Sequence, residues 1–154
     1  MTKIAITSTS NPAAVEVRLS DAPVEYEFTG DVIADVNRRG NWIDGLELLR
    51  SRGFSLERAL APFDPKPRAP RVRHRGAKPT ATYDGQADAG FLYLPYASPD
   101  VVEREPLLLK RSHSIEDENA TFGLGADKAL VLVRFRVPAS ERLDTFLQLF
   151  GGQL

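Results

Sequence analysis

The sequence predicts an α+β fold in which two related, strand-rich halves each end in one helix and pack together as a pseudo-dimer. The composition is that of an ordinary globular protein, since 42% of the 154 residues are hydrophobic, 27% are charged and none is cysteine. Apolar strand-like segments precede a helical pattern, and this order occurs twice along the chain. We therefore predict a first repeat over residues 1–64, a basic, proline-rich linker over 65–79 and a second repeat over 80–154. Each half alone buries little apolar surface, so the two are expected to share an interface.

The first half contains four predicted strands and one helix. The strands cover residues 15–19, 24–28, 32–36 and 43–50, and a turn at 37–40 separates the last two. Apolar and polar residues alternate in the first two strands, which is typical of strands with one buried face. The helix is indicated by apolar residues at the i, i+3, i+4, i+7 spacing of one helix face, namely Leu56, Ala59, Leu60 and Phe63. Ser55 is the predicted N-cap, and Pro62 stops the helix.

The second half repeats this order. Its predicted strands cover residues 90–94, 101–105, 106–110, 120–124 and 127–134. The helical spacing returns 87 positions later at Leu143, Phe146, Leu147 and Phe150, after Ser140 as the N-cap. The strand before each helix also matches, since Leu46, Leu48 and Arg50 correspond to Leu130, Leu132 and Arg134. This shared order of strand, arginine, cap and helix predicts an internal duplication.

A basic segment joins the two halves. Residues 66–78 contain six cations, Lys66, Arg68, Arg71, Arg73, Arg75 and Lys78, and no acid, although the net charge of the whole chain is −1. Its prolines favour an extended chain that cannot enter a sheet. Nucleic-acid phosphates could be bound, in a salt-sensitive and sequence-independent way, by Arg68, Arg71, Arg73 and Arg75. The lack of interleaved aromatic residues favours instead a contact with a protein or with the acidic halves themselves.

Two segments have the character of family signatures. Residues 83–94 read Tyr-Asp-Gly-Gln-Ala-Asp-Ala-Gly-Phe-Leu-Tyr-Leu, and residues 35–49 read Asp-Val-Asn-Arg-Arg-Gly-Asn-Trp-Ile-Asp-Gly-Leu-Glu-Leu-Leu. They resemble the Y-D-x-x-A-D-A-x-Y opening and the D-x-N-x-x-G-x-x-x-G-L-E-L-L closing hairpin of a widespread family of small prokaryotic domains of unknown function. Because the two signatures fall in different halves, the resemblance implies tandem, diverged copies. It further implies a small β-rich fold with a C-terminal helix, no established activity, and accessory or antitoxin-type partnership with small toxins.

Residues able to carry catalysis are few. Asp84 and Asp88 are four positions apart, but aspartates before a strand are typical of turns, and we predict a turn here. The histidines are His74 and His113, and a metal site between them would need an acid from elsewhere in the chain, so no metal site or cofactor is predicted. The sequence has no cysteine and no Gly-x-Ser-x-Gly element. A small hydrolase that uses Asp84, Asp88 and His113 is therefore the weaker alternative.

The sequence favours a non-enzymatic regulatory or accessory protein-binding module, with nucleic-acid binding through the basic linker as the alternative. Trp42, Tyr93 and Tyr96 are the predicted protein contacts, because Trp and Tyr often anchor interfaces. Packing of these three side chains in the core is the other interpretation. The chain lacks both a stretch of roughly 20 apolar residues that could cross a bilayer and an apolar signal at its N-terminus, which predicts a cytoplasmic protein.

Overall fold

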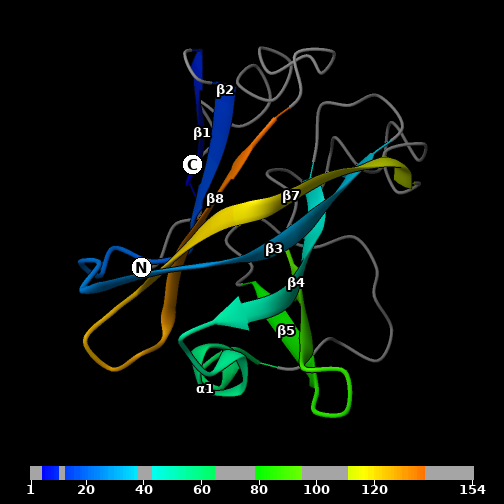
Figure 1. The fold of residues 1–154 in the computed structure, drawn as a ribbon. Coiled ribbons are helices and arrows are strands. Elements are labelled where there is room, and N and C mark those ends of the chain that lie inside the picture. The colour runs from blue at the N-terminus through cyan, green and yellow to red at the C-terminus, as the bar shows by residue number, and fades with distance from the viewer. Residues whose placement is uncertain (1–4, 11–12, 38–42, 65–78, 95–110, 138–154) are drawn as a thin grey trace.

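The computed structural model describes residues 5–10, 13–37, 43–64, 79–94 and 111–137. These residues form one antiparallel sheet of eight strands and one short helix (Figure 1). The strands are β1 (Ala5–Ser10), β2 (Ala13–Arg18), β3 (Tyr26–Asn37), β4 (Ile43–Arg52), β5 (Thr80–Asp84), β6 (Ala89–Tyr93), β7 (Arg111–Leu124) and β8 (Leu130–Arg136), and the helix is α1 (Leu56–Leu60). The strand order across the sheet is β1-β2-β8-β7-β3-β4-β6-β5.

Most local predictions for the first half are confirmed. β2 overlaps the predicted strand at 15–19, β3 joins the strands predicted at 24–28 and 32–36 into one, and β4 begins at the predicted position. α1 begins after Ser55, whose Oγ accepts a hydrogen bond from the Arg58 N–H, and it ends before Pro62.

In the second half, β6 and β8 lie close to the predicted strands at 90–94 and 127–134. β7 contains the predicted strand at 120–124 but extends back to Arg111, and β5 was not predicted. The strands predicted at 101–105 and 106–110 and the helix predicted over 143–150 lie outside the described residues.

The predicted α+β architecture, in which two halves each closed by a helix pack as a pseudo-dimer, is wrong. The strands of the two halves are interleaved, because β2 pairs with β8, β3 with β7 and β4 with β6. α1 has only five residues, so the described part of the chain is mainly β. Pairing between the halves satisfies strand edges that two separate sheets would leave open, and it merges two small cores into one.

The strand order has an internal symmetry. If β1, β2, β3 and β4 are exchanged with β5, β6, β7 and β8, respectively, the strand order is the same when it is read from the opposite edge of the sheet. The β3–β7 pair lies at the centre of this order. These two central strands are antiparallel and pair from Tyr26 opposite Leu124 to Asn37 opposite Arg111. Such an order arises when two equivalent units contribute strands to a common sheet. A duplicated sequence is compatible with it, whereas separate packing of the two halves is not.

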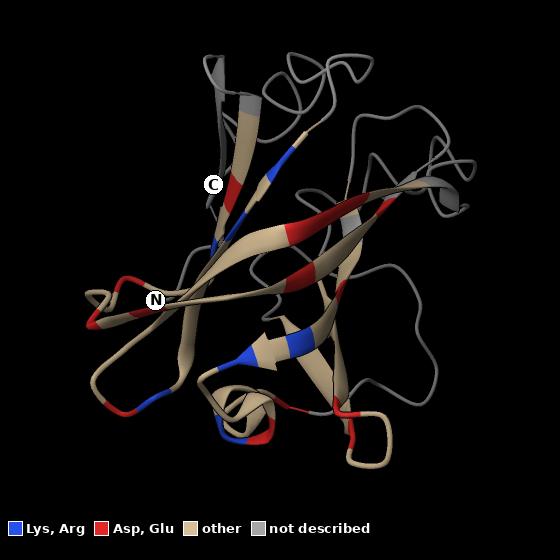
Figure 2. Ribbon diagram, viewed as in Figure 1, with Lys and Arg blue, Asp and Glu red and all other residues tan. Residues whose placement is uncertain are grey.

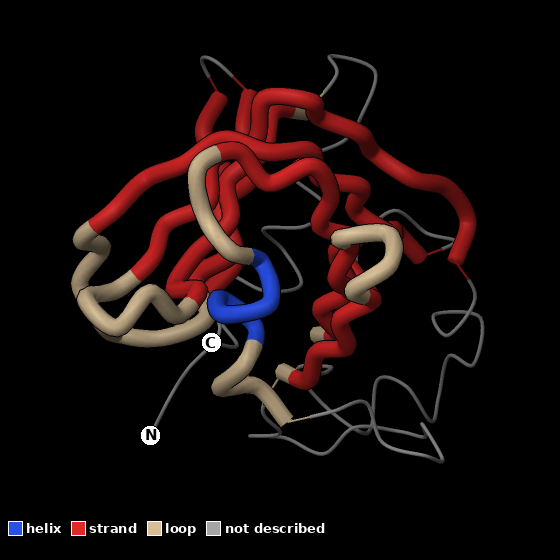
Figure 3. Tube along the Cα trace, turned by 60° about the horizontal axis from the view of Figure 1, so that its bottom comes forward, coloured by secondary structure: helices blue, strands red, loops and turns tan. Residues whose placement is uncertain are grey.

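The sheet curves around a single core. Figure 3 shows the strands bending around the space in which α1 lies. Buried apolar residues come from strands at both ends of the sheet and from its centre, among them Val15, Val17, Leu46, Leu92 and Phe122. α1 packs Leu60 closely against Gly90 on β6, where a Cβ would collide with the leucine side chain. The absence of a side chain at Gly90 therefore lets the helix approach the sheet.

Candidate functional site

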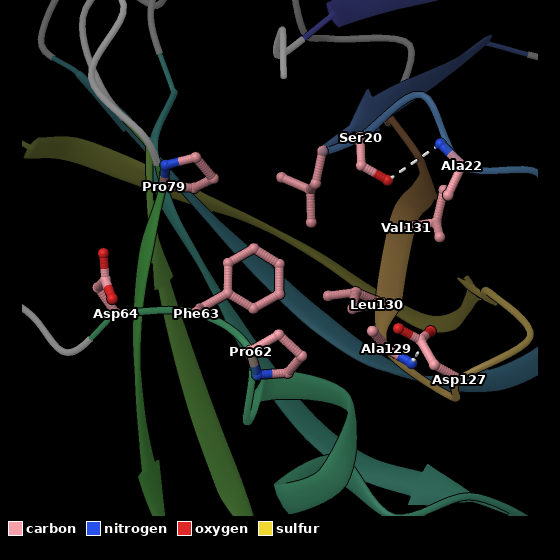
Figure 4. Close-up of a pocket in the computed structure, with 11 residues that line it drawn as sticks. Ser20, Ala22, Pro62, Phe63, Asp64, Pro79, Asp127, Ala129, Leu130 and Val131 are labelled. Atoms are coloured by element: carbon pink, nitrogen blue, oxygen red, sulfur yellow. Dashed lines mark hydrogen bonds between the residues drawn. The ribbon is translucent and has the colours of Figure 1, made fainter. Parts of the chain in front are cut away.

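A pocket of about 370 Å³ opens between two walls that are distant in sequence (Figure 4). One wall consists of Pro62, Phe63 and Asp64 after α1 and Pro79 before β5. The other consists of Leu19, Ser20 and Ala22 after β2 and of Asp127, Ala129, Leu130 and Val131 around the start of β8. Figure 4 shows the Phe63 ring extending from the first wall toward Leu130 on the second. The pocket therefore exists only because the curved sheet brings its two ends near each other.

The first wall is held in place by the residues that flank the basic linker. Phe63 follows Pro62 and packs against the core. The Asp64 carbonyl oxygen accepts a hydrogen bond from the Ala81 N–H at 2.8 Å, and Asp64 also forms an isolated parallel bridge with Thr80. The chain on the two sides of the basic linker thus lies side by side at the pocket.

The second wall is formed by the β7–β8 turn and by the chain that follows β2. The Leu19 N–H donates to the Val131 carbonyl at 2.7 Å, which continues the contact of this chain with β8. Within the turn, Asp127 Oδ1 accepts from the Ala129 N–H at 3.0 Å, and the Gly125 N–H donates to the Ala129 carbonyl at 2.9 Å. These hydrogen bonds hold the Asp127 carboxylate at the rim of the pocket.

The pocket combines an apolar interior with an acidic rim. Leu19 and Leu130 are buried, and Phe63 is half-buried. The exposed residues Asp64 and Asp127 lie at opposite sides of the pocket (Figure 4). The described lining contains no lysine, arginine or histidine. Such an arrangement favours an apolar group that carries a positive charge or stands next to one.

The predicted protein contacts do not line this pocket. Tyr93 is half-buried on β6, and the centroid of its ring lies 4.3 Å from that of Phe91. Because these two residues are two positions apart on one strand, they share the sheet face opposite the buried Leu92. Trp42 and Tyr96 lie outside the described residues. A contact role for the three aromatic residues stays a prediction.

The predicted nucleic-acid contacts also lie outside the described residues, namely Arg68, Arg71, Arg73 and Arg75, together with His74. The structure describes instead Asp64, which directly precedes the basic linker, and Pro79, which is the last residue of the linker. Both line the pocket. The basic linker therefore starts and finishes beside the acidic rim.

Asp84 and Asp88 build a turn, which confirms that prediction. Asp84 Oδ1 accepts from the backbone N–H groups two and three residues later, at 3.0 and 3.5 Å. Asp88 has a positive φ of 46°, which Asp tolerates better than most residues. The Tyr83 hydroxyl donates to Asp88 Oδ1 at 2.7 Å. This hydrogen bond, followed by burial and by the charges of Asp88, Glu57 and Asp84, raises the pKa of Tyr83 to about 12.

The candidate hydrolase residues are not brought together by the sheet. The backbone of His113 lies on β7, opposite Val36, and strands β3, β4 and β6 separate β7 from β5 and its Asp84. The path across the sheet from β7 to β5 therefore crosses four gaps between neighbouring strands, each of about 4.8 Å. Within the described part of the chain, no three His, Cys, Asp or Glu residues form a group that could hold a metal ion.

The two segments that resemble family signatures are neighbours in the sheet. Their strands, β4 and β6, pair with Gly45 opposite Tyr93 and Glu47 opposite Phe91. A Cβ at Gly45 would lie 2.6 Å from a ring carbon of Phe91 and 2.6 Å from the Leu92 carbonyl oxygen. The Phe91 ring therefore covers the backbone of Gly45, and only glycine leaves it room. Signatures that are split between the halves of the sequence are joined in the folded protein.

Ion pairs connect neighbouring strands outside the pocket, where Figure 2 shows acidic and basic stretches on adjacent ribbons. Asp31 on β3 lies 3.3 Å from Arg50 Nη1 and 3.2 Å from Arg52 Nη2, both on β4. Glu16 on β2 pairs with Arg134 on β8 at 2.8 Å. The arginines of these pairs are 44–76% exposed, so each pair contributes about 0–1 kcal/mol.

Asp117 joins β7 to β8 where their ladder has ended. The last pair of that ladder is Thr121 opposite Arg134. Beyond it, Asp117 Oδ2 accepts from the Arg136 N–H at 2.7 Å, and Oδ1 accepts from the Asn119 N–H at 2.9 Å and from Arg136 Nη2 at 3.1 Å. Burial by itself raises the pKa of the Asp117 carboxyl, but these hydrogen bonds and the Arg136 charge outweigh burial and hold the pKa below its usual value. This carboxylate therefore has a structural role.

No protein-family model matches the chain, and neither a curated protein nor a solved structure matches it. The resemblance to the family of small prokaryotic domains thus stays an expectation from two short segments. In the part of the chain that the structure describes, no helix has the length and apolar character required to cross a membrane.

Sequence reasoning missed this pocket. Its lining comes from segments at 19–22, 62–64 and 127–131 and from Pro79, and their residue types are ordinary for loops. The available signal was indirect, because Asp64 directly precedes the basic linker and Pro79 is its last residue. Only the folded chain shows that these positions face the β7–β8 turn.

Proposed function

We propose that this protein is a non-enzymatic binding module whose pocket receives an apolar side chain of a protein partner, next to a lysine or arginine of that partner. One observation carries the proposal. The pocket is mainly apolar, has the acidic residues Asp64 and Asp127 in its lining, and has no cation among its described lining residues. An accessory or regulatory role, including partnership with a small toxin, belongs to this class of function.

The pocket supports an anchoring contact of modest strength. Burial of one leucine or phenylalanine side chain contributes about 1.5–3 kcal/mol. Each ion pair with an exposed rim carboxylate adds about 0–1 kcal/mol. The sum, about 1.5–5 kcal/mol before the entropy cost of association, allows at best a sub-millimolar affinity. The partner must therefore contact surface outside the pocket as well, as is usual for an interface built around one anchor.

A random peptide library displayed on phage and selected against the purified full chain tests this proposal. We expect the enriched peptides to share an aliphatic or aromatic residue adjacent to lysine or arginine. Binding of these peptides should weaken as salt increases, because the rim carboxylates are exposed. A selection without enrichment, or a consensus that lacks the cation, contradicts the proposal.

Two alanines in the β7–β8 turn provide matched variants. Ala129 lines the pocket, whereas Ala126 is exposed in the same turn and does not line it. Ala129→Leu fills the pocket and should weaken peptide binding about tenfold, while Ala126→Leu should leave binding unchanged. The double variant Asp64→Asn, Asp127→Asn should remove most of the salt dependence, and asparagine keeps an oxygen for the Ala129 N–H. Equal losses in the two leucine variants would count against the pocket.

Nucleic-acid binding through the basic linker is a second candidate function. The hydrogen bond between the Asp64 carbonyl and the Ala81 N–H favours it, because the six cations lie on a segment whose two ends are held together. Six phosphate contacts would give a slope of log affinity against log salt of about −4 for single strands and about −5.4 for duplex DNA. Titration with labelled single- and double-stranded oligonucleotides measures this slope. Glutamine at positions 68, 71, 73 and 75 should abolish binding, and unchanged binding excludes this function.

A further inference from the structure

A second pocket, beside the same β7–β8 turn, has the opposite charge. Its volume is about 190 Å³, and it is lined by Phe28, Gly53, Phe54, Ser55, Arg58, Leu124 and Lys128. Two cations and no described acid line it, whereas the first pocket has two acids and no described cation. We infer that this second pocket binds a small anion built on one aromatic ring, an aromatic carboxylate or an aryl phosphate. This inference does not depend on the function proposed above.

The floor of the second pocket is aromatic. The ring centroids of Phe28 and Phe54 are 5.2 Å apart, and Leu124 beside them is 1% exposed. Gly53 has a φ of 90°, which lies in the left-handed region that favours glycine, and a Cβ there would lie 3.1 Å from the Phe28 ring. Glycine at this position therefore leaves the edge of the Phe28 ring uncovered. A ligand ring can pack against these two phenylalanines in an offset or tilted arrangement.

Three lining residues of this pocket carry hydrogen-bond donors, namely Ser55, Arg58 and Lys128. The Lys128 ammonium lies 3.4 Å from the centroid of the Tyr26 ring, and this cation–π contact limits its range of positions beside the pocket that Lys128 lines. Ser55 Oγ accepts from the Arg58 N–H at 3.2 Å, which leaves the Ser55 O–H to donate. The Arg58 guanidinium presents paired N–H groups that match the oxygens of a carboxylate or phosphate. The donors thus suit an anion.

Neither cation is neutralised by a described carboxylate. The ion pairs formed by the described residues include neither Arg58 nor Lys128. Glu57 precedes Arg58, but its charge helps to raise the pKa of Tyr83, outside this pocket. Asp127 precedes Lys128 but lines the first pocket. Two cations that form no ion pair with a described carboxylate, beside an apolar lining, attract an anion and disfavour a neutral or cationic ligand.

Titration of the full chain with phenyl phosphate, followed in the two-dimensional amide NMR spectrum, tests this inference. We expect saturable shifts of the amide signals of Phe54, Ser55 and Lys128, and benzoate should move the same signals. Benzyl alcohol lacks the charge and inorganic phosphate lacks the ring, so each should bind about tenfold more weakly or not at all. Equal binding of either control ligand, or shifts elsewhere only, overturns the inference.

Charge-removing variants supply the second arm of the experiment. Arg58→Gln and Lys128→Asn should each weaken phenyl phosphate binding about tenfold, and asparagine tolerates the positive φ of 69° at position 128. Arg18→Gln is the matched control, because Arg18 is a cation outside both pockets. The spectra without ligand show whether each variant keeps its fold. A folded variant with unchanged affinity, or an equal loss in Arg18→Gln, shows that the inference is wrong.

Discussion

Replacing Asp117 by alanine removes the carboxylate that joins β7 to β8 beyond the end of their ladder. Its side chain is 3% exposed and accepts hydrogen bonds from the backbone N–H groups of Asn119 and Arg136 and from the Arg136 guanidinium. The substitution leaves both backbone N–H groups without this acceptor in a partly buried position. We therefore expect a large loss of stability from one residue outside the apolar core.

The structure gives the size of this loss. A hydrogen bond to a charged group contributes about 1.5–3 kcal/mol, so the two backbone bonds contribute about 3–6 kcal/mol. Water reaches part of the gap because Asn119 and Arg136 are exposed, which places the expected loss for Asp117→Ala near the lower limit, about 3 kcal/mol. The Arg136 side chain is 63% exposed, so the ion pair adds about 0–1 kcal/mol. Arg136→Gln keeps the backbone donor and should cost less than about 1 kcal/mol.

Urea unfolding followed by circular dichroism measures the free energy of unfolding of both variants and of the wild type. The pKa of Asp117 lies below its usual value in the folded protein. The Asp117 carboxylate therefore contributes to the free energy of unfolding at pH values above its unfolded pKa of about 4, and this contribution is lost as the pH falls through its pKa in the folded protein. The stability difference between the wild type and Asp117→Asn should shrink below about pH 4. The reasoning is refuted if Arg136→Gln is as unstable as Asp117→Ala, or if this difference does not depend on pH.

Three further predictions concern the Tyr83 hydroxyl, Gly45 and the cap of α1. Folding favours the protonated hydroxyl of Tyr83, so this stabilisation is present below about pH 10 and is lost as the pH rises toward 12. The phenolate absorbance of the wild type, compared with that of Tyr83→Phe, should show one tyrosine that titrates near pH 12. Titration of Tyr83 near its ordinary pKa would contradict this prediction. Gly45→Ala forces a Cβ against the Phe91 ring and should cost about 1–3 kcal/mol in urea unfolding. Gly85→Ala, where a Cβ meets only ordinary contact, is its control, and equal costs would exclude the steric explanation. Ser55→Ala removes the acceptor of the Arg58 N–H and should cost about 1 kcal/mol, or about 2–4 °C in thermal unfolding, and Ser55→Thr should restore most of it.

Elements that depend on near neighbours were predictable from the sequence. Alternation at Val15 and Val17 indicates a strand with one buried face, and β2 buries both residues. Ser55 marks the start of α1 because its side chain can accept from a backbone N–H three residues later. Asp84 indicates the turn before β6 for a similar local reason. In each case, the interaction spans only a few positions along the chain.

The strand partners were not predictable in this way. β2, β3 and β4 share similar apolar patterns, so each pattern is compatible with several partners. The sequence therefore left open whether strands of the two halves pair with each other. The observed pairs β2–β8, β3–β7 and β4–β6 depend on contacts between distant parts of the chain, and a shared core favours them. Tyr93 illustrates the same limit, because its aromatic type does not reveal that its ring packs beside Phe91.

The sequence by itself determined where most strands, the helix cap and the Asp84 turn lie, and it determined that a basic linker separates two acidic parts of the chain. Only the tertiary structure decided that both parts build one sheet and that Asp64 and Asp127, 63 positions apart, share the rim of one pocket. Side-chain periodicity and capping act within one pleat or one helical turn. A pocket between two ends of a sheet appears only after distant strands have paired, and that pairing is decided by the burial of the whole core.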